Sequence, residues 1–410
     1  MSKIDLPENT NFSTNLENED FFFHSNQFKH TNIVPKLLDD LQQVVEDLLS
    51  KSSKLKNLTK ILSSGATFKI PEYLQSSVIG NSFQFNVSKQ ISLSGLHIGA
   101  VDGGLVSGTL AGIDILGLKG VGVYFHYGSS KITKAKYFPG KHQDITILPV
   151  HKNFTSSDFE LFSSLQRSIL ELKTGIQLLE EAPASLDYLL MDGSFQFKRM
   201  VTPNTELNIL FGKYFAYLRK LISIAHTQNT KVLFVVKDSK TSFFMDLVSQ
   251  LLPHIIPSFK ELYTIDYRTI VQNLRDSNFM HYLLDTGYRS FIINRSHGSK
   301  EPIEVHNIPY SFYLKVVKND LPLRIDMLIP PSVSTHALQF EIDEISKIII
   351  ALSDYNLNYS LPAPIVEADA RAKINQEQFD LILEYIRNKT FNYNSIEGLK
   401  LRRSRSPFKF

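Results

Sequence analysis

The chain has 410 residues, of which 43% are hydrophobic and 21% charged, and its net charge is +3; this balance excludes wholesale disorder and a global basic field. It contains no cysteine, which excludes disulfides, thiolate metal sites, iron–sulfur clusters and cysteine nucleophiles. No apolar run approaches the roughly 20 residues of a membrane-spanning helix, and the polar, acidic N-terminus lacks the apolar stretch of a secretory signal, so we expect a soluble, cytoplasmic protein without a membrane partner.

The N-terminal part of the chain divides into two predicted segments. Residues 1–30 are expected to form a flexible arm, and residues 31–95 a helical N-terminal region. Within the latter, leucine and valine recur every three to four residues from Pro35 to Leu62, which indicates an amphipathic helix. Its apolar face packs either on its own domain or on another subunit, and the pattern leaves both alternatives open.

Residues 96–138 are predicted to form consecutive strands punctuated by glycines. The first, LHIGAVDGG, is apolar up to Asp102, after which two glycines are expected to turn the chain. Ser157 and Glu160 have the spacing of a capping box at the start of a helix. The buried seam of that helix is predicted to consist of Leu165, Ile169, Leu172, Ile176 and Leu179.

Strands and helices continue to alternate along the rest of the chain. Strands are expected at 186–191, 231–236, 288–294, 311–317 and 323–329, and helices at about 205–225, 336–352 and 375–387. No internal repeat is present. The order predicts one elaborated mixed α/β domain over residues 96–398, with insertions and C-terminal helical additions.

The C-terminal segment, 399–410, is a basic tail without an acidic residue. It carries five positive charges, on Lys400, Arg402, Arg403, Arg405 and Lys409. Removing these five charges from the net +3 leaves the remaining residues at −2. The tail is therefore either a local binding element for a polyanion or a disordered, solubilising end.

Two stretches share one design, an apolar strand that leads to Asp-Gly. They are IGAVDGG, which contains Asp102, and LLMDGS, which contains Asp192. One Asp-Gly pair alone is typical of a turn. Two copies on neighbouring strands would place two carboxylates close together, which is unfavourable unless a cation lies between them. Mg²⁺ and Mn²⁺ prefer such oxygen ligands, so the pattern favours a metal site.

Further acidic residues could contribute to the same site. Glu171 lies at the edge of the buried face of the predicted helix, where its carboxylate could reach the strands; alternatively it forms a surface pair with Arg167 at i,i+4. Glu367 and Asp369 follow the LPAPIV segment and precede Arg371. These charges suit metal and phosphate binding together, but a solvated charged turn is the default interpretation.

Taken in order, these motifs resemble the NurA nucleases of archaeal DNA end resection. The resemblance extends from about Gly99 to Ile374 and includes the helix from Arg167 to Glu171. Each motif is short, and their order and spacing make the resemblance specific. The motifs are AVDGG at 100–104, LLMDGS at 189–194, VVKDS at 235–239, SFYLKVV through LPLRIDMLIP at 311–330, and LPAPIVEADARA at 361–372.

The resemblance implies an RNase H-like core, a homodimer, and Mn²⁺-dependent cleavage of DNA as a 5′-to-3′ exonuclease and endonuclease, with a hexameric HerA helicase-translocase as partner in double-strand break repair. Asp102, Glu171 and Asp192 would be metal ligands for two Mn²⁺ or Mg²⁺ ions, with Asp102 bridging. Such ions would activate water and stabilise the leaving oxygen. Lys237 would stabilise transition-state charge or contact a phosphate.

The last motif departs from the family pattern. The family usually has histidine after Glu-Ala, whereas this sequence has Asp369, which is itself a competent ligand for hard metals. Tyr359 is the candidate for the tyrosine that accompanies this motif, although the spacing does not fix the correspondence.

Two other function classes fit parts of the pattern. The segment AVDGGLVSGTL also resembles the phosphate-binding hairpin of sugar-kinase and actin-like ATPases, but no glycine-rich adenosine motif follows and Glu171 would have no role there. The departure at Asp369 leaves open a non-catalytic adaptor that docks on a ring ATPase and DNA.

Overall fold

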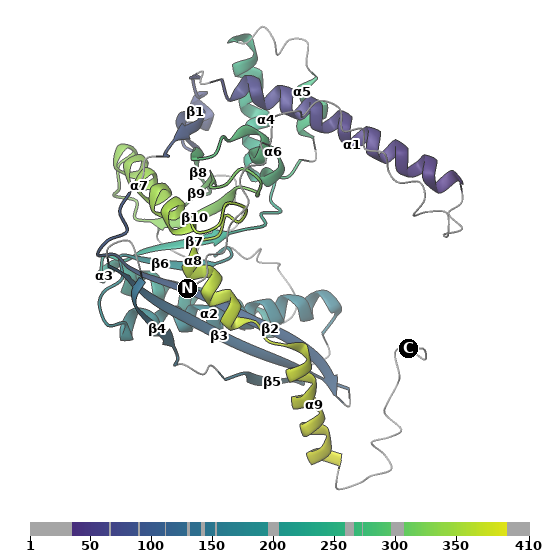
Figure 1. Ribbon diagram of the computed structural model, residues 1–410, viewed down its shortest axis with the longest axis vertical. Helices are drawn as coiled ribbons and strands as arrows, with labels where there is room; N and C mark the ends of the chain where they lie inside the picture. Colours follow the sequence, from purple (N-terminus) through teal and green to yellow (C-terminus); the bar gives the residue numbers. More distant parts are fainter. Residues whose placement is uncertain are drawn as a thin grey trace, which may run out of the picture. The chain divides into compact units, whose positions relative to one another are not determined.

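A computed structural model describes residues 35–391, apart from 65–66, 89–90, 111, 129–131, 141–143, 152–153, 196–204, 259–265, 273 and 297–306. The predicted arm at 1–30 and the basic tail at 399–410 lie outside the described residues. One ten-stranded sheet organises the described part of the chain, in the order β1-β8-β9-β10-β7-β6-β2-β3-β4, with β5 paired to β3 (Figure 1).

The strands coincide closely with the apolar stretches predicted from residue 96 onward. They are β1 (Val78–Asn86), β2 (His97–Leu110), β3 (Ile113–Tyr127), β4 (Ile132–Phe138), β5 (Thr146–Val150), β6 (Tyr188–Asp192), β7 (Lys231–Val236), β8 (Tyr288–Asn294), β9 (Ile308–Lys315) and β10 (Leu323–Ile329). The sheet is mixed, because β2, β6 and β7 run parallel while their neighbours β3 and β10 pair antiparallel to them. The prediction of a mixed α/β sheet is confirmed.

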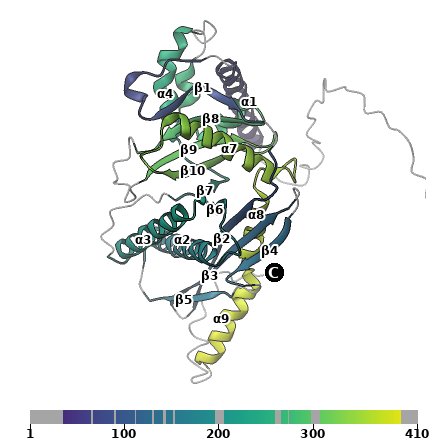
Figure 2. The same ribbon diagram turned by 90° about the vertical axis from the view of Figure 1, so that its left-hand side faces the viewer.

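Helices cover both faces of this sheet (Figure 2). They are α1 (Pro35–Leu62), α2 (Ser156–Glu181), α3 (Thr205–Thr227), α4 (Phe243–Ile255), α5 (Tyr267–Val271), α6 (Asp276–Leu283), α7 (Thr335–Ser353), α8 (Ala363–Ala372) and α9 (Gln376–Phe391), with short 3₁₀ turns at Glu72–Leu74 and Ile256–Ser258. The sides of β2 alternate between two cores: Ala100 belongs to the core with α7 and α8, and Val101 to the core with α2 and α3.

Helix α2 confirms the predicted seam but not the predicted cap. Leu165, Ile169, Leu172, Ile176 and Leu179 are all buried. The N-cap is Thr155, two residues before the predicted Ser157, and its side chain accepts a hydrogen bond from the Asp158 backbone N–H at 3.2 Å. A hydroxyl residue followed three positions later by an acid occurs in both registers, and Thr155 is the one that terminates the preceding extended segment.

The region 31–95, predicted as helical, also contains a strand. Strand β1 pairs antiparallel with β8 at the edge of the sheet. The predicted helix α1 forms, and its last turns, from residue 54, bury Leu55, Leu58 and Leu62 in a core with α4 and α6. The described residues of α1 before residue 54 belong to a separate unit, and in it the side chains of Leu41, Val44, Val45, Leu48 and Leu49 are exposed.

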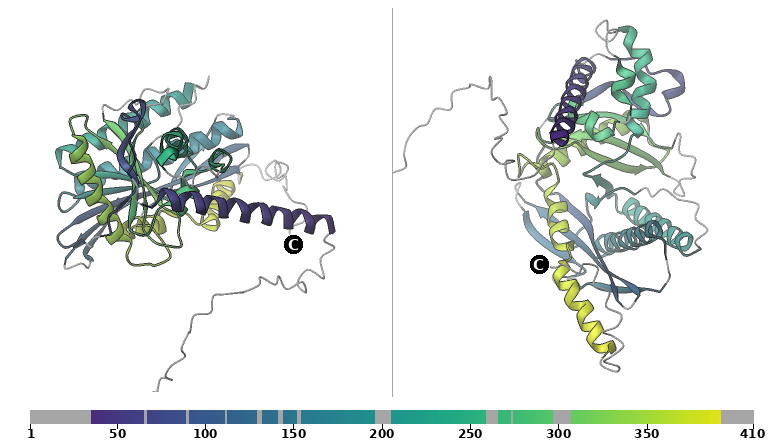
Figure 3. Two further views of the ribbon diagram at one scale, coloured as in Figure 1. Left: turned by 90° about the horizontal axis from the view of Figure 1, so that it is seen from above. Right: turned by 90° about the vertical axis from the view of Figure 1, so that its right-hand side faces the viewer.

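Glu367 and Asp369, for which a charged turn was one expectation, instead lie on helix α8. Pro364 near its start is compatible with the first helical turn, where the missing N–H is not needed. Helices α8 and α9 follow one another along the β2–β3 hairpin, as the yellow segments beside the blue strands in Figure 3 show. Phe379 of α9 packs there on Ile115 and Ile374, so the hairpin and the C-terminal helices share a core.

Candidate metal centre

Asp102 and Asp192 lie side by side on two parallel strands. Val101 of β2 is in register with Met191 of β6, so the residues that follow them are neighbours on the α8 face of the sheet. The side chain of Asp102 is buried, and its Oδ1 accepts a hydrogen bond from the Gly103 N–H at 2.7 Å. The predicted proximity of the two aspartates is therefore present in the structure.

The two aspartates differ in their backbone setting. Asp192 ends β6 and is followed by Gly193 in the left-handed region, with φ +86°. Asp102, in contrast, lies inside β2, which continues to Leu110, so the prediction that Gly103 and Gly104 turn the chain is wrong. The two glycines serve close approach instead: a Cβ at Gly103 would lie 2.5 Å from Glu171 Oε1, and one at Gly104 would collide with the Ala372 carbonyl oxygen.

Glu171 approaches Asp102 from the other face of the sheet, through the space that Gly103 leaves. Its side chain is almost fully buried, and Oε1 lies 3.2 Å from Nε of Arg167, which is 44% exposed. Both sequence interpretations therefore hold together, since the i,i+4 pair with Arg167 forms at the site itself. Burial raises the pKa of Glu171 to about 8; Arg167 opposes this shift, while Asp102 and Asp192 add to it.

Asp369 and Lys237 lie on the solvent-facing side of Asp102, Glu171 and Asp192, and the five residues together are called the cluster below. Asp369 comes from α8, and its carboxylate is 51% exposed; Lys237 directly follows β7. The Lys237 Nζ lies 3.7 Å from Asp369 Oδ1 and 3.9 Å from Asp192 Oδ2. Although burial acts to lower the Lys237 pKa, the nearby carboxylates raise it above its ordinary value, so this side chain is a cation at neutral pH.

The electrostatics identify the four carboxylates as one interacting group. Burial, followed by the charges of Asp192 and Asp369, raises the pKa of Asp102 to about 7. Burial also raises the pKa of Asp192, against the opposing effect of Lys237. The cluster resists full ionisation by itself, which is the behaviour expected of carboxylates that bind a cation.

The donor set matches a hard divalent cation in its chemistry, since all four candidates are carboxylates. As the side chains stand, no three acidic or histidine groups in the described part of the chain converge closely enough to hold one ion. A shared ion therefore requires rotation of side chains, for which the exposed Asp369 has room. Asp102, Glu171, Asp192 and Asp369 would hold such an ion.

Two residues of the last motif are placed differently with respect to the cluster. Glu367 points away: its Oε1 accepts hydrogen bonds from Arg371 Nε at 2.6 Å and from the Tyr137 hydroxyl at 3.1 Å. Tyr359 lies close enough for Lys237 and Asp369 to act on its phenol, whose pKa burial raises. Tyr359 is thus a neighbour of the cluster, whereas Glu367 is held in a surface contact.

Two charged residues that support the cluster, Arg324 and Asp326, were not predicted from the sequence except as part of a strand. Both are buried on β10 and bond to the segments that follow β6 and β7. The available signal was an alternation of charge within an otherwise apolar strand, LRIDMLI. Two opposite charges at i and i+2 share one face of a strand, which predicts a buried pair.

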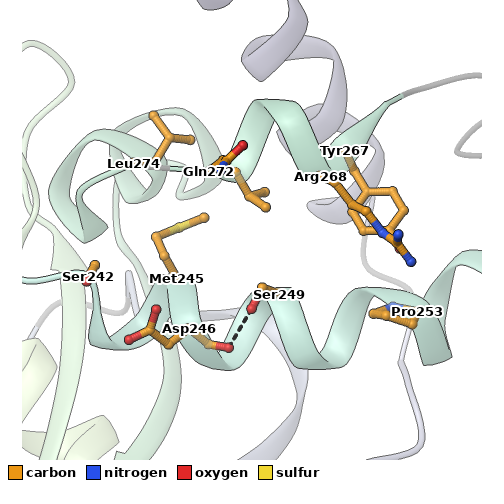
Figure 4. Close-up of a pocket in the computed structure, with 10 residues that line it drawn as sticks. Ser242, Met245, Asp246, Ser249, Pro253, Tyr267, Arg268, Gln272 and Leu274 are labelled. Atoms are coloured by element: carbon orange, nitrogen blue, oxygen red, sulfur yellow. Dashed lines mark hydrogen bonds between the residues drawn. The ribbon is translucent and has the colours of Figure 1, made fainter.

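A cavity of about 510 Å³ lies elsewhere, beside α4 and α5. Figure 4 shows residues that line it, among them Asp246, Ser249 and Arg268, with the Ser249 hydroxyl donating to the Asp246 main-chain oxygen at 2.8 Å. None of the predicted site residues lines this cavity. Across the described segments, no helix is both long and apolar enough to cross a bilayer.

Comparisons with known proteins agree with the motif order. A family model described as the NurA domain matches residues 96–374, and among curated proteins none matches the chain. The crystal structure of the NurA nuclease from Sulfolobus solfataricus matches with a TM-score of 0.56 and 15% identity, over 88% of this chain and 98% of that one. This similarity shows a shared RNase H-like fold.

Two further matches are more distant. A NurA structure with manganese matches with a TM-score of 0.46 and 10% identity, over 86% of this chain and 97% of that one. A NurA structure bound to dAMP and manganese matches with a TM-score of 0.34 and 13% identity, over 86% and 95%.

Proposed function

Because the chain belongs to the NurA family, we propose that it is a DNA nuclease that depends on a divalent metal, Mn²⁺ or Mg²⁺, with Asp102, Glu171, Asp192 and Asp369 as its ligands. The observation that carries this proposal is the meeting of these carboxylates, from two strands and two helices, beside the cation of Lys237. Carboxylates that oppose each other's ionisation are stabilised in their charged form by a bound cation.

Within this proposal, each residue of the cluster has a distinct task. When bound, the metal supplies Lewis-acid stabilisation of phosphate charge and a more acidic water nucleophile. Asp102 and Glu171 form the buried floor, where low solvent access strengthens their charge interactions. Asp369 and Lys237 lie on the exposed side, where a DNA backbone can reach them, and the Lys237 ammonium binds a phosphate oxygen.

Asp369 takes the place of the family histidine as an oxygen ligand. Its charge raises the pKa of Asp102, and its carboxylate lies within ion-pair distance of Lys237, so it is built into the cluster. A carboxylate in this position adds a negative charge that a neutral imidazole would not supply. Hard cations such as Mg²⁺ and Mn²⁺ prefer such an oxygen ligand. We therefore propose that the substitution preserves nuclease activity.

The family assignment and the geometry both disfavour the kinase-like alternative. In that reading the glycines after Asp102 would leave space for a nucleotide phosphate. Here Glu171 occupies the space beside Gly103, and the Ala372 carbonyl occupies that beside Gly104. The non-catalytic adaptor remains the alternative that experiment must separate from a nuclease.

We propose the finer features of the function from the family resemblance. They are a homodimer, 5′-to-3′ exonuclease and endonuclease activity, and action with a hexameric HerA-type ATPase in DNA end resection. The exposed leucine and valine side chains of α1 between residues 41 and 49 are available for a protein contact of this kind.

The decisive experiment measures cleavage of linear DNA with and without Mn²⁺, for the wild type and for Asp102→Asn, in the presence and absence of the ring ATPase. The amide keeps the volume of the side chain and removes the charge that holds the cation. We expect metal-dependent cleavage by the wild type and a loss of at least about 100-fold in the variant. Wild-type cleavage by a correctly folded variant would exclude this site, and an inactive wild type that still binds the ATPase would favour the adaptor.

A further inference from the structure

A buried ion pair lies beneath the proposed nuclease site. Arg324 and Asp326 are 5% and 0% exposed. The guanidinium donates two hydrogen bonds to the carboxylate, from Nε to Oδ1 at 2.9 Å and from Nη2 to Oδ2 at 3.0 Å. Ile325 between them belongs to the core with α7 and α8, so the pair lies on the opposite face of the sheet from Asp102 and Asp192.

One end of this pair holds the segment that carries Asp192. The Ser194 hydroxyl donates to Asp326 Oδ2 at 3.0 Å, and Ser194 is separated from Asp192 only by Gly193. Ser194 lies two residues beyond the end of β6, so this hydrogen bond restricts the path of the chain as it leaves the strand. The direction of the Asp192 carboxylate therefore depends on the position of Asp326.

The other end holds the segment that carries Lys237. Arg324 Nη1 donates to Ser239 Oγ at 2.8 Å and to Thr241 Oγ1 at 3.2 Å. Strand β10 pairs with β7, and β7 pairs with β6, so one ion pair on β10 is joined to the segments that follow β7 and β6. Both connections run through hydroxyl groups two residues after a site residue.

Stability alone is a weak reason for such a pair, because the cost of removing two charges from water often exceeds their attraction. Both carboxylate oxygens of Asp326 are nevertheless hydrogen-bonded: Oδ1 also accepts from the Ser311 hydroxyl at 2.7 Å, and Oδ2 accepts from Ser194 and Arg324. Arg295 Nη1 lies 3.6 Å from Oδ2, beyond hydrogen-bond distance, and is buried without a hydrogen-bond partner among the described residues. Hydrogen bonds at both oxygens of a buried carboxylate restrict the segments bonded to it.

We propose that the Arg324–Asp326 pair is the positioning element of the site. By holding Ser194 and Ser239, it sets the placement of the Asp192 carboxylate relative to the Lys237 ammonium. Neither residue of the pair touches the metal or the DNA; each acts through a hydroxyl group on a site segment. This inference rests on the nuclease function proposed above and adds the residues that align it.

Two serine variants separate positioning from stability. Ser194→Ala and Ser311→Ala each delete one hydroxyl that donates to the Asp326 carboxylate, but only Ser194 belongs to a site segment. Substituting Asp326 itself is less informative, since it leaves Arg324 and Arg295 buried without a counter-charge and endangers folding.

We expect Ser194→Ala to weaken Mn²⁺ binding, measured by calorimetry on the full chain without DNA, by about tenfold, as loss of an outer partner of a metal ligand does. Its kcat should fall by a similar factor while KM for DNA changes little. Ser311→Ala should lower the melting temperature as much as Ser194→Ala does, but it should leave Mn²⁺ affinity and kcat at the wild-type level. Ser239→Ala should reduce cleavage without changing Mn²⁺ affinity, because Lys237 is not a ligand.

Equal effects of Ser194→Ala and Ser311→Ala on Mn²⁺ affinity would overturn the proposal, since both would then report only stability. Normal Mn²⁺ affinity in Ser194→Ala would overturn it as well. These outcomes differ from failure of the nuclease function itself, which would appear as an absence of Mn²⁺-dependent cleavage by the wild type.

Discussion

Replacing Glu171 by glutamine should stabilise the metal-free protein at high pH while abolishing its activity. The Glu171 carboxyl is buried beside Asp102, and burial raises its pKa from 4.5 to about 8. A group whose pKa is raised on folding contributes its full stabilisation below the unfolded value, and this contribution is lost as the pH rises through the folded value. The glutamine amide has no charge to bury and nearly the same volume.

The size of this loss of stability follows from the distance between the unfolded and folded pKa values of Glu171. Between pH 4.5 and about 8 only the folded protein retains the proton, and each pH unit costs about 1.4 kcal/mol, so the whole window amounts to about 5 kcal/mol. Asp102, whose pKa is raised to about 7, acts in the same direction. The lost contact with Arg167 weighs little against this, because Arg167 is 44% exposed.

The assay is urea unfolding at pH 5, 6.5 and 8 in EDTA, for the wild type, Glu171→Gln and Glu367→Gln. Glu171 contributes about 4 kcal/mol to the fall in the free energy of unfolding of the wild type from pH 5 to 8, so the fall in Glu171→Gln, to which Asp102 still contributes, should be smaller by about this amount. Glu367→Gln changes a carboxylate bonded to Arg371 and keeps Glu171, so it should retain the wild-type slope. Adding Mn²⁺ at pH 8 should stabilise the wild type but not Glu171→Gln. A slope in Glu171→Gln equal to that of the wild type would refute the reasoning.

Two further predictions concern the C-terminal part of the chain. Asp369→Ala should reduce Mn²⁺-dependent cleavage by at least about tenfold and more than Glu367→Ala, because Glu367 bonds to Arg371 and Tyr137 instead of joining the cluster; equal losses in cleavage rates would show that the motif is misaligned. Deleting residues 400–410 should weaken DNA binding at moderate salt and flatten its salt dependence by roughly one unit per lost phosphate contact, with the rate at saturating DNA unchanged. A loss of affinity that is independent of salt would instead indicate docking of the tail's apolar residues, and unchanged affinity for DNA and for the ATPase would mean that the tail only solubilises the chain.

Regular elements and the neighbouring aspartates could be predicted from the sequence because they depend on residues close together in the chain. Apolar runs of strand length led to β2, β6 and β7, and spacing of three to four residues led to the seam of α2. The repeated design of an apolar strand leading to Asp-Gly pointed to Asp102 and Asp192 as a pair, and the parallel pairing of β2 with β6 makes them neighbours. Position along a repeat determines which face a side chain occupies, and the sequence displays that directly.

The tertiary structure decided what the glycines after Asp102 do. Glycine lacks a side chain, and this property suits a turn and a close contact equally well, so the local sequence cannot distinguish them. Strand β2 passes straight through Gly103 and Gly104 because Glu171 of α2 and the Ala372 carbonyl of α8 fill the space on either side. Those partners are more than sixty residues away along the chain.

The carboxylates of the site could be predicted from the sequence, whereas the Arg324–Asp326 pair could not, because its role depends on partners far away along the chain. The acidic residues are conspicuous by type and position, whereas Arg324 and Asp326 resemble any charges in a short strand until their partners are known. Ser194 lies 132 residues from Asp326, and Ser239 lies 85 residues from Arg324. Local periodicity predicts which face a residue presents, but only the packing of distant segments determines what that face meets.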